Sequence, residues 1–97
     1  GAGRFPQVAG MIYTFDALAP VGSRISDVTI GGADLNTDTV YGVVSNNYVR
    51  NGGDGYKMFL SAINAYDYGP DLADVTAEFL ANNSPYTPYL DGRIKMK

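Results

Sequence analysis

The 97 residues of this sequence include no cysteine and no histidine. The absence of cysteine excludes disulfides and thiol catalysis, and the absence of histidine excludes a Ser-His-Asp triad. A transition-metal site is not expected either, because carboxylates alone suit hard cations. The ten acidic residues are dispersed, and no pair has the spacing of a two-metal site. We therefore assign no catalytic and no metal-binding residues to this chain.

The charged residues also narrow the range of partners. Seven lysines and arginines are scattered among ten aspartates and glutamates, which gives a net charge of −3. A nucleic-acid-binding surface needs a basic patch, so none is expected. No apolar run approaches the roughly 20 residues of a membrane-spanning helix, and the first residues lack the basic and apolar stretches of a secretory signal. We expect a partner that is neither nucleic acid nor a membrane.

One short stretch has the oxygen spacing that opens a calcium-binding loop. Asp34 and Asp38 occupy the first and fifth positions of such a loop. The sixth position is Thr39 instead of glycine, and the twelfth is Ser45 instead of glutamate. Both departures remove a required feature of the loop, so the sequence predicts a hydrophilic connection without a metal.

The apolar periodicity predicts an α+β fold in a single domain of residues 1–97. Its predicted elements are strands at 7–15, 24–30, 40–47 and 93–96 and helices at 57–66 and 72–81. Residues 40–47 are rich in valine, which is typical of a strand buried on both faces. The order of the elements predicts a small mixed sheet with two helices.

The second predicted helix has clear end signals in the sequence. A Gly-Pro pair precedes it, and Asp71 is placed to cap the helix at 72–81. Asp74 and Glu78 lie in its N-terminal half, where the helix macrodipole favours negative charge. The helix at 57–66 rests on apolar spacing alone.

A glycine-rich turn at residues 51–55 is the most distinctive stretch of the chain. Three glycines within four residues allow positive φ angles, so the backbone can turn sharply. Asp54 lies between two of them, and Tyr48 lies six residues earlier, at the end of the predicted third strand. A ring, an acid and a backbone cleared of side chains suit a ring-bearing ligand with hydroxyl groups. The residues alone are equally compatible with a plain turn in which Asp54 caps a helix.

Two aromatic residues differ from the other tyrosines and phenylalanines. Most aromatic residues occupy core-like or tail positions, and simple packing is expected for Tyr13, Phe15, Tyr41, Phe59 and Phe79. Phe5 and Tyr48 instead flank turns and lie outside the apolar periodicity. Either a minor core cluster or a contact with a ligand accounts for this pair.

Four segments of the chain match a known family in order and spacing. They are residues 3–10 (GRFPQVAG), 22–24 (GSR), 41–56 with NGGDGY at its end, and 91–94 (DGRI). Together they resemble the C-terminal domain of the 5′-nucleotidase family, which includes 2′,3′-cyclic phosphodiesterases and UDP-sugar hydrolases. The resemblance runs over nearly the whole chain, and the glycine-Asp-glycine turn combined with the upstream Phe-x-Gln-Val segment is its most specific part.

The resemblance implies a divided site. In this family an N-terminal metallophosphatase domain carries two metal ions and a catalytic His–Asp pair, and the C-terminal domain holds the nucleoside. Phe5 and Tyr48 match the two aromatic rings that sandwich the base, although the second ring is commonly Phe. Asp54 matches the acid that accepts hydrogen bonds from the ribose hydroxyls, where a charge-assisted bond is the stronger kind. Its supporting loop consists of Asn51, Gly52, Gly53 and Gly55.

The resemblance also sets expectations for the whole protein. This chain matches only the later part of the family's C-terminal domain, so we expect it to be the substrate-binding part of a hydrolase and inactive alone. Divalent metal ions are expected in the missing N-terminal domain, and none in this chain. The expected partners are a nucleotide or nucleoside, that metallophosphatase domain and a second copy of this fragment. The expected location is the periplasm or the outside of the cell.

Two other functions stay open at this point. A branch of the same superfamily acts on thiosulfate attached to a carrier protein and would have no use for two stacking rings. A stand-alone, non-enzymatic binding module belongs to a different class and need not have a nucleoside pocket.

Overall fold

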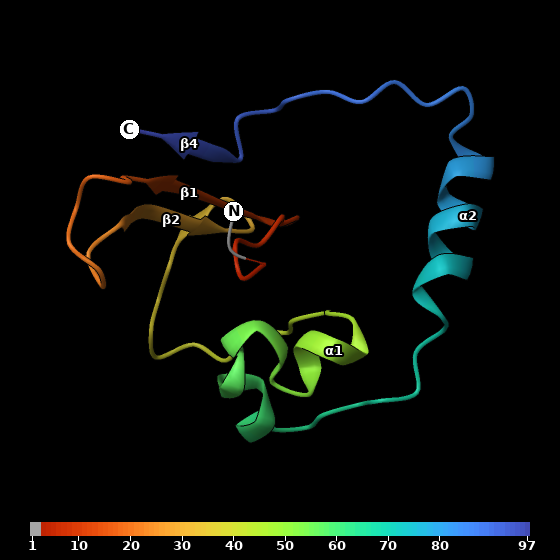
Figure 1. Ribbon diagram of the computed structural model, residues 1–97, viewed down its shortest axis with the longest axis horizontal. Coiled ribbons are helices and arrows are strands. Elements are labelled where there is room, and N and C mark those ends of the chain that lie inside the picture. Colours follow the sequence, from red (N-terminus) through yellow and green to blue (C-terminus); the bar gives the residue numbers. More distant parts are fainter. Residues whose placement is uncertain (1–2) are drawn as a thin grey trace. The chain divides into compact units, whose positions relative to one another are not determined.

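The computed structural model describes residues 3–97 and divides the chain into two compact units (Figure 1). The sheet unit consists of Pro6–Tyr41 and Tyr89–Lys97. The helical unit consists of Gly42–Pro88 together with the described residues up to Phe5. Each unit therefore joins segments that are distant in the sequence.

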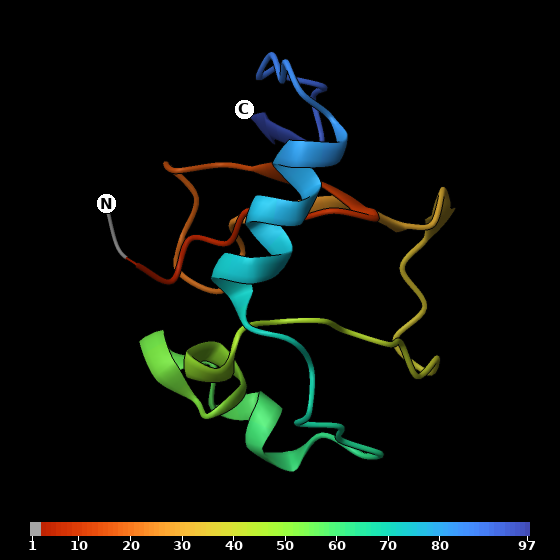
Figure 2. The same cartoon turned by 90° about the vertical axis from the view of Figure 1, so that its right-hand side faces the viewer.

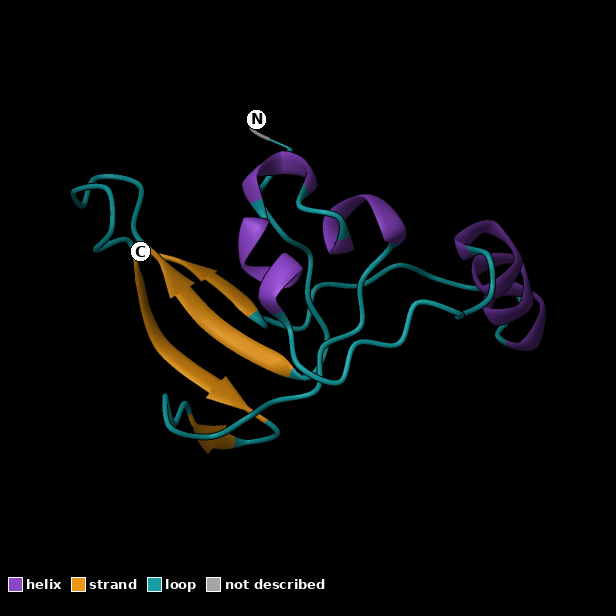
Figure 3. Cartoon of the chain, turned by 90° about the horizontal axis from the view of Figure 1, so that it is seen from below, coloured by secondary structure: helices purple, strands orange, loops and turns teal. Residues whose placement is uncertain are grey.

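The sheet unit contains a four-stranded mixed sheet in the order β3-β2-β1-β4. Its strands are β1 (Met11–Phe15), β2 (Ile25–Ile30), β3 (Ala33–Asp34) and β4 (Ile94–Met96). Strand β1 pairs antiparallel with β2 and parallel with β4, while β2 and β3 form a short antiparallel pair. The predicted α+β class with a small mixed sheet is confirmed, and Figure 3 shows the strands in orange.

Tyr13 forms the centre of the sheet unit. Tyr13 is 4% exposed, and no other hydrophobic residue among 3–97 is as fully buried. Opposite it, β2 carries a bulge because the register shifts between Ile12 and Thr14, and Asp27 adopts a φ of 51° there. The Tyr13 hydroxyl donates a hydrogen bond to the Pro6 carbonyl at 3.3 Å. A bulge bends its strand, so this irregularity shapes the sheet around the buried ring.

Arg93 fixes the start of β4 beside β1. Its carbonyl accepts a hydrogen bond from the Tyr13 N–H at 2.9 Å, and its Nη1 donates to the Val8 carbonyl at 2.8 Å. Asp91 accepts bonds from Arg93 Nε through both carboxylate oxygens, each at 2.8 Å, and from the Arg93 backbone N–H at 3.1 Å. Together these bonds lower the pKa of Asp91 from its ordinary value of 3.8 to about 2. The side-chain hydrogen bonds from Arg93 make the largest contribution.

The predicted strand at 40–47 is wrong. Residues 40–46 belong to no strand, and a helix begins at Asn47. Val40, Val43 and Val44 are 74%, 65% and 98% exposed, whereas the valine-rich composition had indicated a strand buried on both faces. Branched side chains favour extended backbone, but a strand also needs a neighbour with free hydrogen-bonding groups. Figure 1, whose colour bar locates residues 40–46, draws this stretch without a strand arrow.

The other predicted strands are confirmed with shorter bounds. The first begins at Met11 instead of residue 7, because the preceding Gly10 takes a φ of 77°. Strands β2 and β4 each begin one residue later than predicted. The two-residue strand β3 was not predicted, since so short a segment has no periodicity to read.

The helical unit contains four helical segments, shown in purple in Figure 3. They are α1 (Asn47–Arg50), the 3-10 turn η1 (Gly53–Gly55), the 3-10 helix η2 (Lys57–Ser61) and α2 (Leu72–Asn82). Helix α1 is capped by Asn46, whose side chain accepts a hydrogen bond from the Val49 N–H at 2.8 Å. Figure 2 shows the three short segments following one another along the chain.

The predicted helix at 57–66 is wrong in type and length. Only Lys57–Ser61 is helical, as a 3-10 helix, and Ala62 is already extended. Asn64 adopts a left-handed φ of 52°, which an α-helix does not allow. Arg50 holds this region instead, because its Nη1 donates to the Phe59 carbonyl at 2.7 Å and its Nε lies 3.0 Å from Asp67 Oδ1. Tertiary contacts thus override the apolar spacing.

The predicted helix at 72–81 is confirmed as α2, which ends one residue later. Asp71 caps it as expected, since its Oδ1 accepts a hydrogen bond from the Ala73 N–H at 2.8 Å. Asp74 lies in the first turn, where the macrodipole favours a carboxylate. Among residues 3–97, no helix has both the length and the apolar character required to cross a bilayer.

Candidate functional site

The glycine-rich turn connects α1 to η2 through an unusual backbone. Gly52 and Gly55 have φ angles of 86° and 85°, and Asp54 between them has φ 52° and ψ 24°. A left-handed conformation is uncommon outside glycine, although aspartate tolerates it better than most residues. Such conformations cluster at functional sites, so this turn is a candidate for one.

Tyr48 and Asp54 are brought into contact by this turn. The Tyr48 hydroxyl donates a hydrogen bond to Asp54 Oδ1 at 3.3 Å. Tyr48 lies on α1 and not at the end of a strand, so its predicted setting is wrong while its proximity to the turn is confirmed. The residue is 58% exposed, so part of its surface is accessible to a ligand. An aromatic surface and a carboxylate therefore lie next to each other.

Gly53 makes room for the Tyr48 ring. A Cβ atom at Gly53 would lie 2.5 Å from Tyr48 Cε1 and 2.6 Å from two further ring atoms. Real Cβ atoms do not approach carbon so closely, and any other residue would displace the ring or the turn. The absence of a side chain at this position thus has a packing reason, whereas Gly52 and Gly55 are the glycines of the turn with a positive φ.

Gly3 lies beside the Asp54 carboxylate in the same way. A Cβ atom there would lie 2.8 Å from Asp54 Oδ2. The chain before Phe5 therefore passes close to the acid, and a side chain at position 3 would collide with the carboxylate.

A longer-range contact joins the same two segments. The Tyr56 hydroxyl donates a hydrogen bond to the Arg4 carbonyl at 2.7 Å, across 52 residues of sequence. The Tyr56 ring stacks on Phe59, with centroids 5.9 Å apart and an interplanar angle of 11°. Tyr56 was not among the predicted site residues. Its position directly after the glycine turn was visible in the sequence, but no local pattern links it to Arg4.

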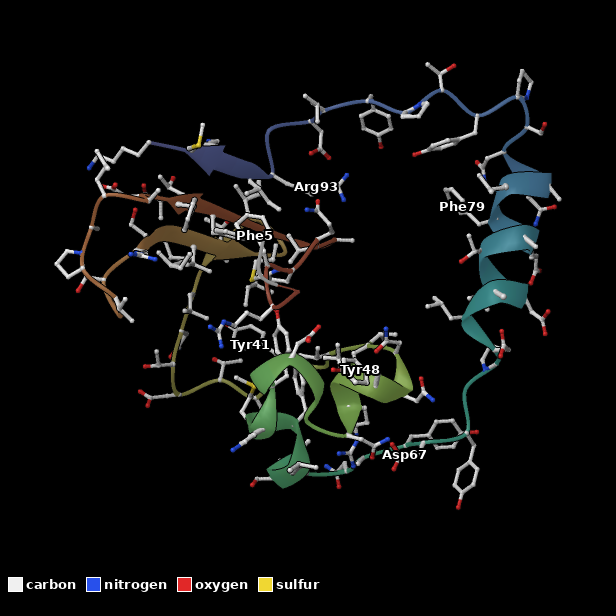
Figure 4. All side chains as sticks on the ribbon, in the orientation of Figure 1. Phe5, Tyr41, Tyr48, Asp67, Phe79 and Arg93 are labelled. Carbon is white, nitrogen blue, oxygen red and sulfur yellow. The ribbon has the colours of Figure 1, made fainter. Side chains whose placement is uncertain are left out.

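Phe5 follows Arg4 directly and is 44% exposed. Figure 4 labels Phe5 and Tyr48 among the side chains. The structure thus joins Tyr48 and Asp54 directly and ties the residue before Phe5 to the turn that carries them. The supporting loop is held by local bonds, because Asn51 Nδ2 donates to the Asn47 carbonyl at 2.8 Å and Gly52 N–H to the Val49 carbonyl at 3.0 Å.

The chemistry of this arrangement is that of binding. An aromatic ring offers a stacking face, and a carboxylate accepts hydrogen bonds from hydroxyl groups. No group of three or more Asp or Glu side chains within residues 3–97 is arranged to hold a metal ion. The site therefore has the means to hold and orient a ligand that carries both a flat ring and hydroxyls.

Comparison with known proteins adds an independent observation. A family model described as the 5′-nucleotidase C-terminal domain matches residues 1–61, the part that contains Phe5, Tyr48 and Asp54. The trifunctional nucleotide phosphoesterase YfkN of Bacillus subtilis (strain 168) is 39% identical over 101 residues, which cover 98% of this chain and 7% of that protein.

Two 5′-nucleotidases are more distant relatives. The 5′-nucleotidase of Diplobatis ommata is 30% identical over 100 residues, which cover 95% of this chain and 17% of that protein. That of Homo sapiens is 28% identical over 101 residues, covering 96% of this chain and 18% of its own. The chain thus spans between 7% and 18% of the length of these three relatives.

Proposed function

This chain belongs to the family of 5′-nucleotidase C-terminal domains, and we propose that it holds the nucleoside part of a nucleotide substrate. Residues 1–97 form the later part of that domain in this proposal. Phe5 and Tyr48 stack on the two faces of the base, and Asp54 accepts hydrogen bonds from the ribose hydroxyls. The loop of Asn51, Gly52, Gly53 and Gly55 gives the acid its position.

One observation carries this proposal, the hydrogen bond between the Tyr48 hydroxyl and the Asp54 carboxylate at 3.3 Å. It puts a stacking surface beside an acceptor of hydroxyl protons, and a nucleoside offers both complementary groups. Base–aromatic stacking contributes about 1–3 kcal/mol per base, and a hydrogen bond to a charged group about 1.5–3 kcal/mol. Both contributions are of useful size for substrate selection.

The cleavage chemistry belongs elsewhere in the protein under this proposal. Hydrolysis of a phosphate ester by two metal ions needs an organised set of ligands, and the carboxylates of the described residues do not provide one. We assign the divalent metal ions to an N-terminal metallophosphatase domain, which is then the main protein partner of this chain. The role of this chain's own residues is to bind and orient the nucleoside.

Further partners and the location follow from the same proposal. A second copy of the chain is a candidate partner, because Val43 and Val44 are 65% and 98% exposed and residues 42–46 belong to no strand. The reaction class belongs to nucleotide catabolism. The location that we propose, the periplasm or the outside of the cell, rests on the family resemblance alone.

A binding experiment separates this function from the alternatives. The full-length protein is titrated with adenosine while tyrosine fluorescence is followed, with 2′,3′-dideoxyadenosine as the matched ligand that lacks the sugar hydroxyls. We expect saturable binding of adenosine and weaker binding of the dideoxy compound. A protein that binds neither nucleoside would favour the carrier-thiosulfate branch or a binding module of another kind.

A further inference from the structure

We propose that Tyr56 is a positioning residue that fixes Phe5 in place through its hydrogen bond to the Arg4 carbonyl. The proposal rests on the function given above, in which Phe5 supplies one of the two rings around the base. It concerns recognition of the base and not of the ribose or the phosphate.

The Gly3–Phe5 segment depends on tertiary contacts for its orientation. Arg4 and Phe5 belong to no helix or strand. The bond from the Tyr56 hydroxyl reaches the Arg4 carbonyl, one residue before the ring that has to be placed. A fixed carbonyl restricts the peptide unit that leads into Phe5, so the contact limits the directions available to its ring.

Tyr56 is itself held firmly enough to act as an anchor. Its N–H donates to the Gly53 carbonyl at 3.1 Å, and its own carbonyl accepts from the Phe59 N–H at 3.2 Å. Its ring stacks on Phe59, whose carbonyl in turn accepts the bond from Arg50. The hydroxyl is therefore presented from a part of the chain that is fixed at several points.

The consequence for binding is a matter of pre-organisation. Without the hydroxyl, the peptide unit before Phe5 loses one of the contacts that order it, and any ordering left to the binding step weakens binding. Asp54 keeps its place, because its backbone conformation and its contact with Tyr48 do not involve the Tyr56 hydroxyl. Loss of the hydroxyl should therefore affect substrates that carry a base and spare those that carry only a sugar.

The test is Tyr56→Phe in the full-length protein, which removes the hydroxyl and keeps the ring on Phe59. Three substrates are compared: AMP, ribose 5-phosphate and p-nitrophenyl phosphate. We expect KM for AMP to rise about 3- to 10-fold, as for the loss of one hydrogen bond, with kcat unchanged. KM for ribose 5-phosphate, which carries no aromatic ring, should not change.

Tyr41→Phe provides the matched control. The Tyr41 hydroxyl also bonds to the backbone, accepting from the Asn36 N–H at 3.0 Å, but it lies in the sheet unit. This variant should leave all three KM values unchanged. Melting temperatures of both variants show whether each has folded to the same extent as the parent protein.

The possible failures can be told apart. If the parent protein prefers AMP to ribose 5-phosphate and Tyr56→Phe does not alter that preference, the positioning role is wrong and the nucleoside function stands. An equal rise of KM for all three substrates would also overturn the positioning role, because it would indicate a general structural effect. A parent protein without any preference for AMP over ribose 5-phosphate would overturn both proposals.

Discussion

Asp54 combines a left-handed backbone with an exposed side chain that accepts a hydrogen bond from Tyr48. Oδ1 accepts the bond from Tyr48, and Oδ2 faces the position where Gly3 has no side chain. Asp54 is followed by Gly55, whose φ of 85° costs a glycine little, so the turn continues in the left-handed region without a second side chain there. The same residue thus shapes the turn and presents the acid.

For Asp54→Ala in the full-length protein, we expect kcat/KM for AMP to fall by the equivalent of about 1.5–3 kcal/mol, because a hydrogen bond to a charged group is lost. p-Nitrophenyl phosphate, which has no ribose hydroxyls, should be affected less. Asp54→Asn is the matched control, since asparagine also tolerates the left-handed conformation and keeps an acceptor oxygen. Equal losses on both substrates would point to a folding defect and contradict the ribose role.

Replacement of Tyr48 separates stacking from packing. Tyr48→Ala should raise KM for nucleotides by the equivalent of about 1–3 kcal/mol and leave the melting temperature largely unchanged, because the residue is more than half exposed. Tyr48→Phe keeps the stacking face and loses only the long bond to Asp54, so its effect should be small. A Tyr48→Ala protein that unfolds but keeps a normal KM in its folded fraction would show that the ring serves packing alone.

At the level of the elements, β4 is held to the sheet by side-chain hydrogen bonds as well as by its backbone pairing with β1. The Asp91–Arg93 pair fixes the turn before β4, and the same guanidinium reaches the Val8 carbonyl. The Arg93–Val8 bond joins residues 85 positions apart, so it ties the last strand to the beginning of the unit. The closing DGRI segment of the sequence therefore has a structural role.

This attachment predicts a specific dependence on pH. The pKa of Asp91 is about 2 in the folded chain against an ordinary 3.8, so its stabilising effect is complete above about pH 4 and is lost as the pH falls toward 2. We expect the difference in melting temperature between the parent protein and Asp91→Asn to be constant near neutral pH and to shrink between pH 4 and 2.

Glu78→Gln, on exposed surface of α2, controls for the loss of one negative charge in this experiment. Melting curves are recorded from pH 7 to pH 2 for the three proteins. A difference between the parent protein and Asp91→Asn that grows on the acid side would have the wrong sign for a lowered pKa.

At the level of the whole molecule, binding and cleavage are assigned to separate parts of a longer protein. The sequence has no cysteine or histidine, and the described residues bring no three carboxylates together at a possible metal site. We therefore expect the 97 residues alone to release no phosphate from AMP above background, even with millimolar Mn²⁺, Mg²⁺ or Zn²⁺. Adenosine should bind to them only weakly.

Phosphate release by the purified chain is the measurement, with the Asp54→Ala chain as control. Metal-dependent release that persists through rigorous purification and disappears in Asp54→Ala would contradict the assignment of binding to this chain and of cleavage to another domain. It would mean that the chain carries a catalytic centre of its own.

Local signals in the sequence determined the elements that depend on local physics. Helix α2 and its Asp71 cap were predicted because a cap is an interaction between near neighbours. Strands β1, β2 and β4 followed from alternation along short segments. Phe5, Tyr48 and Asp54 were named from the turn chemistry and from the family resemblance, and their contact with a nucleoside remains a prediction.

The tertiary structure decided whatever depends on partners distant in the sequence. Residues 40–46 have the composition of a strand but no neighbour to pair with, and residues 57–66 follow the contacts of Arg50 more than their own apolar spacing. The bond from Tyr56 to Arg4 spans 52 residues, a separation at which no periodicity or turn rule operates. Hydrogen bonds of this kind form only when the fold brings both groups together, so a sequence can supply the groups without indicating the pair.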